Sequence, residues 1–212
     1  MNDDPEHTED VSSLVEDLAF TATLNDGALV RIRPIAPKDK ERLAEGWKNL
    51  SERSRYLRFL HAKPTLSASD LVYLTEIDYE NHFAWAAEAL DSNDLPGIGI
   101  ARYIRDPIDP VVAEAALAVV DSRQRQGLGR ILLEALSDAA RDNGIERFRA
   151  YVSRSNLPVL KALTNIGAIR GTTEDGMVSL EMPLPMTDFH QSAMYAALRA
   201  AAIHQTHSDD PL

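Results

Sequence analysis

The sequence predicts an α+β fold of three layers, in which helices flank a mixed central β-sheet. Segments of alternating apolar and polar residues stand on both sides of segments with helical apolar spacing. The most periodic helical segment, at 127–141, is followed directly by a strand-like segment at 145–152. The chain has 212 residues, of which 44% are hydrophobic and 26% charged, so it can bury the core of one globular domain.

The first half of this domain is predicted to hold one strand, three helices and three further strands. Pro37 suits the first turn of a helix, Ser51 is a suitable N-cap for a second helix, and Ser67 or Ser69 begins a third. The predicted ranges are strand 28–35, helix 38–50, helix 51–60, a helix from 67 or 69 through 74, and strands 82–90, 98–105 and 111–120.

The second half alternates helices and strands. Helix 127–141 ends at Asn143-Gly144, and a helix capped by Ser155 or Asn156 ends at Gly167. The remaining predicted elements are strand 145–152, a terminal hairpin of strands 168–173 and 177–182, and an alanine-rich C-terminal helix over 187–203.

The charge pattern suggests where the domain begins and ends. Residues 1–20 carry several Asp and Glu but no Lys or Arg, so we expect an acidic flexible tail there. The globular domain is predicted over 21–185, and residues 186–212 are predicted to form a C-terminal helix and tail. The start of the chain lacks the basic and apolar regions of a secretory signal, and no run of about 20 apolar residues predicts a membrane helix. We therefore expect a cytoplasmic protein with no membrane partner.

The composition excludes several kinds of function. A net charge of -11 opposes binding to phosphate backbones, so nucleic acid is not an expected partner. The chain has no Cys, which excludes disulfides, thiolate metal sites and an acyl-cysteine intermediate. His204 and His207 near the end of the chain have no further ligand candidates beside them, and no metal site is predicted.

The segment with the clearest chemistry is the loop that joins strand 111–120 to helix 127–141. Free N–H groups at the start of a helix bind anions, and Gly127 and Gly129 let a phosphate approach the backbone. Arg125 and Arg130 add charge-assisted hydrogen bonds. Neither GxGxxG nor GxxxxGK[ST] occurs in the chain, so the common nucleotide-binding loops are absent.

This strand, loop and helix resemble the GNAT superfamily of acyl-CoA-dependent N-acyltransferases. The family signature Q/R-x-x-G-x-G/A is present as Gln124-Arg-Gln-Gly-Leu-Gly129, and the resemblance covers about residues 28–184. It implies that the loop holds the pyrophosphate of acetyl-CoA, that the preceding strand contacts the pantetheine arm, and that an Asn of the next helix reaches the same cosubstrate. The cofactor-binding residues so implied are Leu117, Val119, Gln124, Arg125, Gln126, Gly127, Leu128, Gly129, Arg130 and Asn156.

Within the superfamily, the sequence is similar to bacterial Pat-type protein lysine acetyltransferases and to acetyltransferase domains fused to acyl-CoA synthetases. The similarity rests on the segment 51–60, on Asp78-Tyr79 with His82, and on Ala113-Glu114. It implies that Glu114 is the general base. The chain leaves no room for the cyclic-nucleotide-binding domain that some Pat-type enzymes carry, so we expect no regulation of that kind.

The residues themselves agree with direct transfer to an amine in a ternary complex. A carboxylate can take the proton of the attacking amine, and the alanines around Glu114 predict a partly buried site for its charge. A backbone N–H near Val119 is the expected oxyanion donor. The sequence identifies no general acid. Considered alone, Glu114 also fits a solvated edge residue or an ion-pair partner, and Asn156 also fits a helix cap.

The predicted function is acetyl-CoA-dependent N-acetylation of an amine, with a protein lysine, such as one on an acyl-CoA synthetase, as the preferred acceptor. A small-molecule amine is the alternative acceptor. A non-catalytic acyl-CoA-binding sensor is the alternative from another class. The protein is expected to be a monomer or a homodimer.

Overall fold

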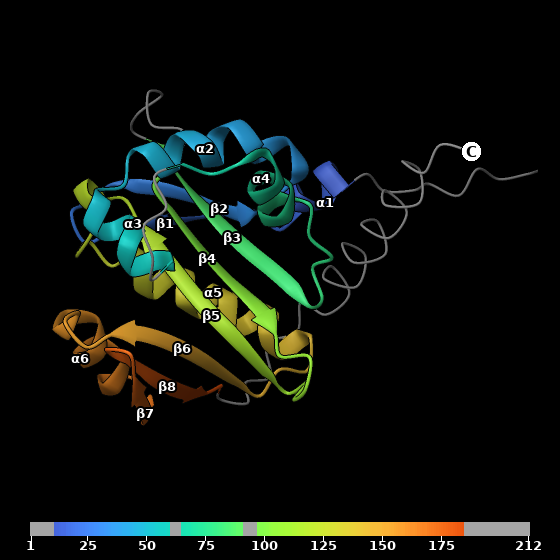
Figure 1. The fold of residues 1–212 in the computed structure, drawn as a ribbon. Coiled ribbons are helices and arrows are strands. Elements are labelled where there is room, and N and C mark those ends of the chain that lie inside the picture. Colours follow the sequence, from blue (N-terminus) through green and yellow to red (C-terminus); the bar gives the residue numbers. More distant parts are fainter. Residues whose placement is uncertain (1–10, 60–64, 91–96, 185–212) are drawn as a thin grey trace, which may run out of the picture.

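The computed structural model describes residues 11–59, 65–90 and 97–184, which form an eight-stranded sheet with helices on both faces (Figure 1). The helices are α1 Val11–Asp17, α2 Lys40–Lys48, α3 Glu52–Phe59, α4 Ala68–Thr75, α5 Leu128–Asp142 and α6 Leu157–Asn165, with short 3-10 turns η1 Pro37–Asp39 and η2 Asp121–Arg123. The strands are β1 Phe20–Thr23, β2 Leu29–Pro34, β3 His82–Ala89, β4 Gly99–Arg105, β5 Val112–Val119, β6 Arg147–Ser153, β7 Ile169–Glu174 and β8 Met177–Pro183. The predicted α+β fold with a mixed sheet is confirmed.

The strand order in the sheet is β1-β2-β3-β4-β5-β6-β8-β7. All neighbours are antiparallel except β5 and β6, which are parallel and are joined through α5. A parallel pair needs such a crossover because the chain must return to the same end of the sheet. The phosphate-type loop therefore lies at the end of β5, directly before the helix that begins the crossover.

The parallel pair β5 and β6 is joined only at its start. Its paired rows are Val112 with Arg147, Ala113 with Phe148, and Glu114 with Arg149. Both strands continue beyond that row, to Val119 and Ser153, but they diverge (Figure 1). The sheet thus opens into a V whose closed end lies at Glu114 and whose open end lies at the loop.

The two faces of the sheet are covered by different helices (Figure 1). On one face, the indole N–H of Trp85 donates to the Ala135 carbonyl of α5 at 3.0 Å, and Leu128 and Leu132 lie against Gly99. Helices α2, α3 and α4 cover the other face. Successive residues of a strand point to opposite faces, so the side chain of Glu114 lies on the α2–α4 face.

The expectation of a flexible tail over residues 1–20 is wrong for its second half. Residues 11–17 form α1, and Phe20 begins β1, which pairs with β2. The helix forms because its apolar residues lie on one side and are buried in the core, namely Val11, Leu14 and Val15. The acidic residues of this segment lie on its exposed side, where Glu16 forms an ion pair with Arg31. The predicted C-terminal helix lies outside the described residues.

Candidate active site

The loop before α5 has the geometry of an anion-binding nest. Arg125 and Gly127 both have left-handed backbone, with φ of 63° and 90°. Within the described residues, the backbone N–H groups of the five residues from Arg125 to Gly129 have no hydrogen-bond partner. Consecutive free N–H groups in such a conformation form a concave site for an anion at the positive end of the helix dipole. Helix α5 has 15 residues, so its aligned peptide dipoles place a full partial positive charge at this end.

A second turn of the chain supports this loop from behind. The N–H of Asn25, in the connection between β1 and β2, donates to the Gln126 carbonyl at 2.9 Å. A Cβ added at Gly127 would lie 3.1 Å from the Asn25 Oδ1. Both its φ and this contact therefore require glycine at position 127. The Oε1 of Gln126 is buried and has no hydrogen-bond partner among the described residues.

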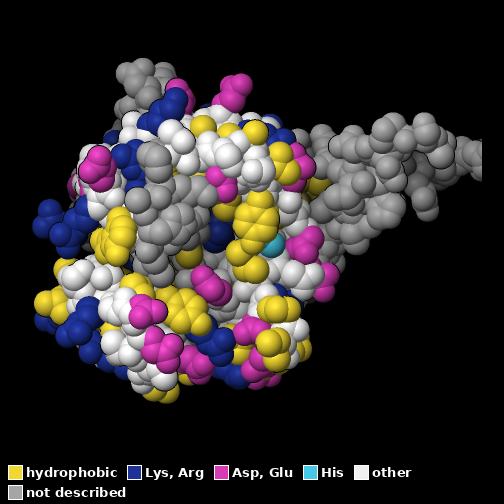
Figure 2. Space-filling view, viewed as in Figure 1, with side chains coloured by type: hydrophobic (Ala, Val, Ile, Leu, Met, Phe, Trp, Pro, Cys, Tyr) yellow, Lys and Arg dark blue, Asp and Glu magenta, His cyan; other side chains and the backbone are white. Residues whose placement is uncertain are grey.

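Gln124 connects the loop to the end of β5 and to α3. Its Nε2 donates to the Val119 carbonyl at 3.0 Å and to the Ser54 hydroxyl at 3.4 Å. The sequence predicted that Gln124 lies in the loop, but it gave no signal for the contact with Ser54. Arg125 and Arg130 are exposed, and Figure 2 shows several basic side chains at the edge of the molecule near α3.

The last part of β5 has backbone groups that point into the open V. The Val120 N–H donates to the Ile98 carbonyl at 3.0 Å, which makes Gly99 and Val119 a non-hydrogen-bonded pair of the β4–β5 ladder. By the alternation of a β-strand, the N–H and C=O groups of Leu117 and Val119 then point away from β4, toward β6. No described strand pairs with them there, because the β5–β6 ladder ends at Glu114.

Glu114 lies at the closed end of the V, in a row of side chains that crosses four strands. Its neighbours in the row are Ile104 on β4 and Arg149 on β6, and His82 on β3 lies beyond Ile104. Glu114 is exposed, which corrects the expectation of a partly buried carboxylate. No described residue forms an ion pair or hydrogen bond with its side chain. The interpretation of Glu114 as an ion-pair residue therefore finds no partner in this part of the chain.

The other polar residues singled out from the sequence lie apart from the V or hold the backbone. Asp78 accepts the backbone N–H groups of Glu80, Asn81 and His82, and these hydrogen bonds outweigh its burial and lower its pKa. The ring Nε2 of His82 lies 2.7 Å from the Arg102 guanidinium and is therefore an acceptor. Asp78 thus shapes the turn that leads into β3.

Asn156 lies at the first position before α6, at the open end of the V. Its side chain is half-buried and forms no capping hydrogen bond with the helix. Its interpretation as a helix cap is therefore not supported, and its amide is free for another partner within the described part of the chain. The structure places the loop residues 124–130, Leu117 and Val119 around one end of the V, with Asn156 on the β6 side of it.

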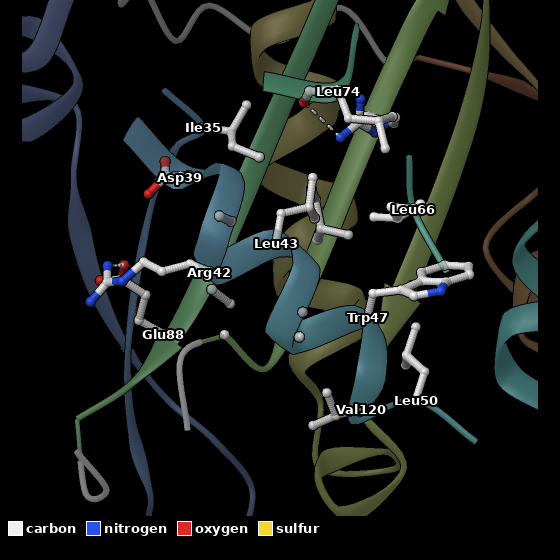
Figure 3. Close-up of a pocket in the computed structure, with 18 of the residues that line it drawn as sticks. Ile35, Asp39, Arg42, Leu43, Trp47, Leu50, Leu66, Leu74, Glu88 and Val120 are labelled. Atoms are coloured by element: carbon white, nitrogen blue, oxygen red, sulfur yellow. Dashed lines mark hydrogen bonds and ion pairs between the residues drawn. The ribbon is translucent and has the colours of Figure 1, made fainter. Parts of the chain in front are cut away.

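A cavity of about 90 Å³ lies between α2 and the sheet, on the same face as Glu114 (Figure 3). Apolar side chains line most of it, among them Leu43, Trp47 and Leu74. At one end, Arg33 forms a bidentate ion pair with Asp39 at 2.7 Å. Burial acts to raise the pKa of Asp39, but the bonds from Arg33 outweigh it and lower the pKa. This ion pair was not predicted, because its two partners are ordinary surface residue types.

Comparison with known proteins decides the family. The model of the acetyltransferase (GNAT) family matches residues 47–167, more than half of the chain. The chain belongs to the GNAT acetyltransferase family. Acetyl-CoA is the acyl donor that this family uses. The loop before α5, strands β5 and β6 that form the V, and Glu114 all lie within the matched residues.

Two GNAT relatives show which members the chain is similar to. It is 35% identical over 159 residues to the acetyltransferase Pat of Mycolicibacterium smegmatis. The matched region covers 74% of this chain and 46% of that protein. It is 32% identical over 142 residues to the acetyltransferase PA5475 of Pseudomonas aeruginosa, covering 67% of this chain and 76% of that one. The chain thus spans less than half of the length of the first relative.

A solved structure shows the same GNAT architecture. The GNAT domain of S. lividans PAT superposes with a TM-score of 0.72 at 31% identity, covering 86% of this chain and all of that one.

In the described ranges, no helix is long and apolar enough to cross a membrane, and no group of three or more His, Asp or Glu side chains is placed to hold a metal.

Proposed function

We propose that this GNAT acetyltransferase transfers the acetyl group of acetyl-CoA to an amine, with a protein lysine as the preferred acceptor. The observation that carries the proposal is the order of parts along the V. Free N–H groups lie at its open end, backbone of β5 that pairs with no described strand lies along its side, and the exposed Glu114 lies at its closed end. This order matches the order of diphosphate, pantetheine arm and thioester in acetyl-CoA.

The loop and β5 are the proposed binding site for acetyl-CoA. The N–H groups from Arg125 to Gly129 fit the diphosphate, because nothing in the described chain competes for them and the left-handed backbone at Arg125 and Gly127 gives the loop its nest conformation. The backbone of Leu117 and Val119 is placed to pair with the amides of the pantetheine arm. The full proposed set is Leu117, Val119, Gln124, Arg125, Gln126, Gly127, Leu128, Gly129, Arg130 and Asn156.

Glu114 is the proposed general base. A lysine ammonium has an ordinary pKa of about 10.4 and must lose a proton before it can attack a thioester. Glu114 takes that proton, directly or through a water, as the amine nitrogen forms a bond to the carbonyl carbon. A backbone N–H of β5 that points into the V is the proposed donor to the oxyanion. The carbon–sulfur bond then breaks and CoA leaves.

The proposed acceptor is a lysine of a protein, such as an acyl-CoA synthetase, and the transfer occurs in a ternary complex. Three facts support it. The chain is similar to a protein named acetyltransferase Pat, its net charge of -11 favours a cationic acceptor, and it has no Cys to hold an acyl group. Nucleic acid and membranes are not proposed partners, and a cytoplasmic location remains a prediction.

The experiment combines binding and turnover. Acetyl-CoA affinity is measured by isothermal titration calorimetry. Release of free CoA thiol is measured with lysine-containing proteins, acyl-CoA synthetases included, and with polyamines and aminoglycosides. We expect binding, and turnover with a protein acceptor. Turnover with small amines alone would contradict the acceptor proposed. Binding without any acetylation would identify a non-catalytic acyl-CoA sensor.

A further inference from the structure

The segment 51–60, which resembles Pat-type enzymes, contains two serines, Ser51 and Ser54, that contact the end of β5 and the loop before α5. The Ser51 N–H and hydroxyl donate to the two carboxylate oxygens of Asp121, each at 2.9 Å. The Ser54 hydroxyl donates to the same carboxylate at 2.9 Å. Asp121 is the first residue of η2, directly after β5. The start of α3 is therefore fixed to the point where β5 becomes the loop.

These contacts continue to the pantetheine-facing backbone. The Ser54 hydroxyl that donates to Asp121 also accepts from the Gln124 amide at 3.4 Å. The other hydrogen of that amide is directed to the Val119 carbonyl at 3.0 Å. Asp121, Ser54, Gln124 and Val119 thus form one chain of hydrogen bonds across the end of β5. We name these four residues and Ser51 the loop clamp.

The carboxylate of Asp121 is well suited to hold this clamp. It is exposed at the surface, and three protein donors occupy its oxygens. Burial acts to raise the pKa of Asp121, but the hydrogen bonds from Ser51 and Ser54 outweigh it and lower the pKa. The group is therefore ionised at neutral pH, and hydrogen bonds to a charged acceptor are stronger than those between neutral groups.

We infer that Asp121 and Ser54 are positioning residues for acyl-CoA: they hold Gln124 on the Val119 carbonyl and so fix the loop and the end of β5 before the ligand binds. The inference rests on the proposed function. It gives Ser51 and Ser54 a role in donor binding, although α3 itself lies on the α2–α4 face. Since α3 is held by the same clamp, loosening of Asp121 would disturb both α3 and the end of β5.

The test compares two serine-to-alanine variants with the same local chemistry. Ser54→Ala removes a hydroxyl bonded to Asp121, within the loop clamp. Ser67→Ala removes a hydroxyl bonded to Asp70 in the capping box of α4, where no loop contact exists in the described chain. The probe is CoA alone, titrated by calorimetry, with the melting temperature of each variant measured in parallel. Ser54→Thr, which keeps a hydroxyl, is the rescue variant.

We expect Ser54→Ala to bind CoA about five- to tenfold more weakly, because the hydroxyl's hydrogen bonds to Asp121 and Gln124 are lost, with Ser54→Thr close to wild type. In turnover, the KM for acetyl-CoA should rise while kcat is largely kept. Ser67→Ala should melt earlier but bind CoA within about twofold of wild type, because its lost cap stabilises α4 alone.

A second variant guards against simple misfolding. Asp121→Asn keeps the shape of the side chain, and combined with Ser54→Ala it should weaken CoA binding by less than the sum of the two single effects. If the losses of CoA affinity in Asp121→Asn and Ser54→Ala simply add, or if Ser54→Ala binds CoA as well as wild type, the inference is overturned. The proposed function still stands in either case, provided that the wild type binds CoA. Absence of CoA binding by the wild type would overturn both.

Discussion

Glu114 and Arg149 face each other across the last paired row of β5 and β6, at the point where the two strands separate. The Arg149 guanidinium does not bond to Glu114. Its two terminal nitrogens lie 3.0 Å from Asp106 Oδ2 and 3.3 Å from Glu181 Oε1. These two carboxylates hold the cation in place, so that the adjacent carboxylate of Glu114 is left without a counterion among the described residues. A carboxylate without a counterion is what the proposed role of Glu114 as general base requires.

The loop glycine can be tested against a glycine with the same backbone conformation elsewhere. Gly127→Ala introduces strain of about 1–3 kcal/mol at φ 90° and a contact of 3.1 Å with Asn25. We expect CoA affinity by calorimetry to fall roughly tenfold or more. Gly144→Ala has a similar φ of 75° with open space around it, at the other end of α5. It should lose stability but bind CoA normally. Equal CoA affinity in both variants would refute the role of the loop.

The sequence predicted the order of elements after residue 28 because each has a local signal. Gly127 and Gly129 before a periodic helix identified the loop, and the turn-rich segment between 90 and 98 indicated the pair of strands β3 and β4. The helix α1 was not predicted, since its apolar stripe is short and is stabilised by packing on the core rather than by its own sequence.

The candidate site was predicted only where it is continuous in the chain. The hydrogen bond from the Asn25 N–H to the Gln126 carbonyl joins two turns about a hundred residues apart, and the bond of Ser54 to Asp121 joins α3 to η2. Neither leaves a pattern in the sequence. The exposure of Glu114 was also mispredicted, because flanking alanines indicate an apolar strand but not whether a helix covers it. Contacts between distant residues, and the covering of a strand face by a helix, both depend on tertiary packing.

The buried ion pair of Arg33 with Asp39 predicts a pH dependence of stability. The pKa of Asp39 is lowered in the folded state, so the pair contributes stability above the unfolded pKa of about 3.9 and loses it as the pH falls through the folded value. Asp39→Asn leaves Arg33 partly uncompensated and should lower the free energy of unfolding by about 3 kcal/mol at pH 7. Urea unfolding between pH 7 and pH 3 measures the pH dependence of the free energy of unfolding in the wild type and its decrease in Asp39→Asn. A variant as stable as wild type at pH 7 would contradict this account.

The cavity beneath α2 offers a stabilising substitution. A Cβ added at Gly46 would meet only the Gly97 carbonyl oxygen, at an ordinary 3.6 Å. Alanine is favoured over glycine in a helix by about 1 kcal/mol, so Gly46→Ala should raise the melting temperature by about 3 °C. At Gly99, by contrast, a Cβ would lie 3.1 Å from both Leu128 and Leu132. Gly99→Ala should therefore lower the melting temperature. Calorimetric melting of both variants checks the opposite signs.

The most direct test of the central claim is the turnover of Glu114→Gln with acetyl-CoA and a protein acceptor, measured as release of free CoA thiol beside calorimetric CoA binding. Glu174→Gln, an exposed strand carboxylate on β7 without a described partner, is the matched control. We predict that Glu114→Gln lowers kcat by about 10²–10⁴-fold, keeps CoA affinity within about twofold, and that Glu174→Gln matches wild type. Wild-type kcat in Glu114→Gln would contradict the assignment of Glu114 as the general base.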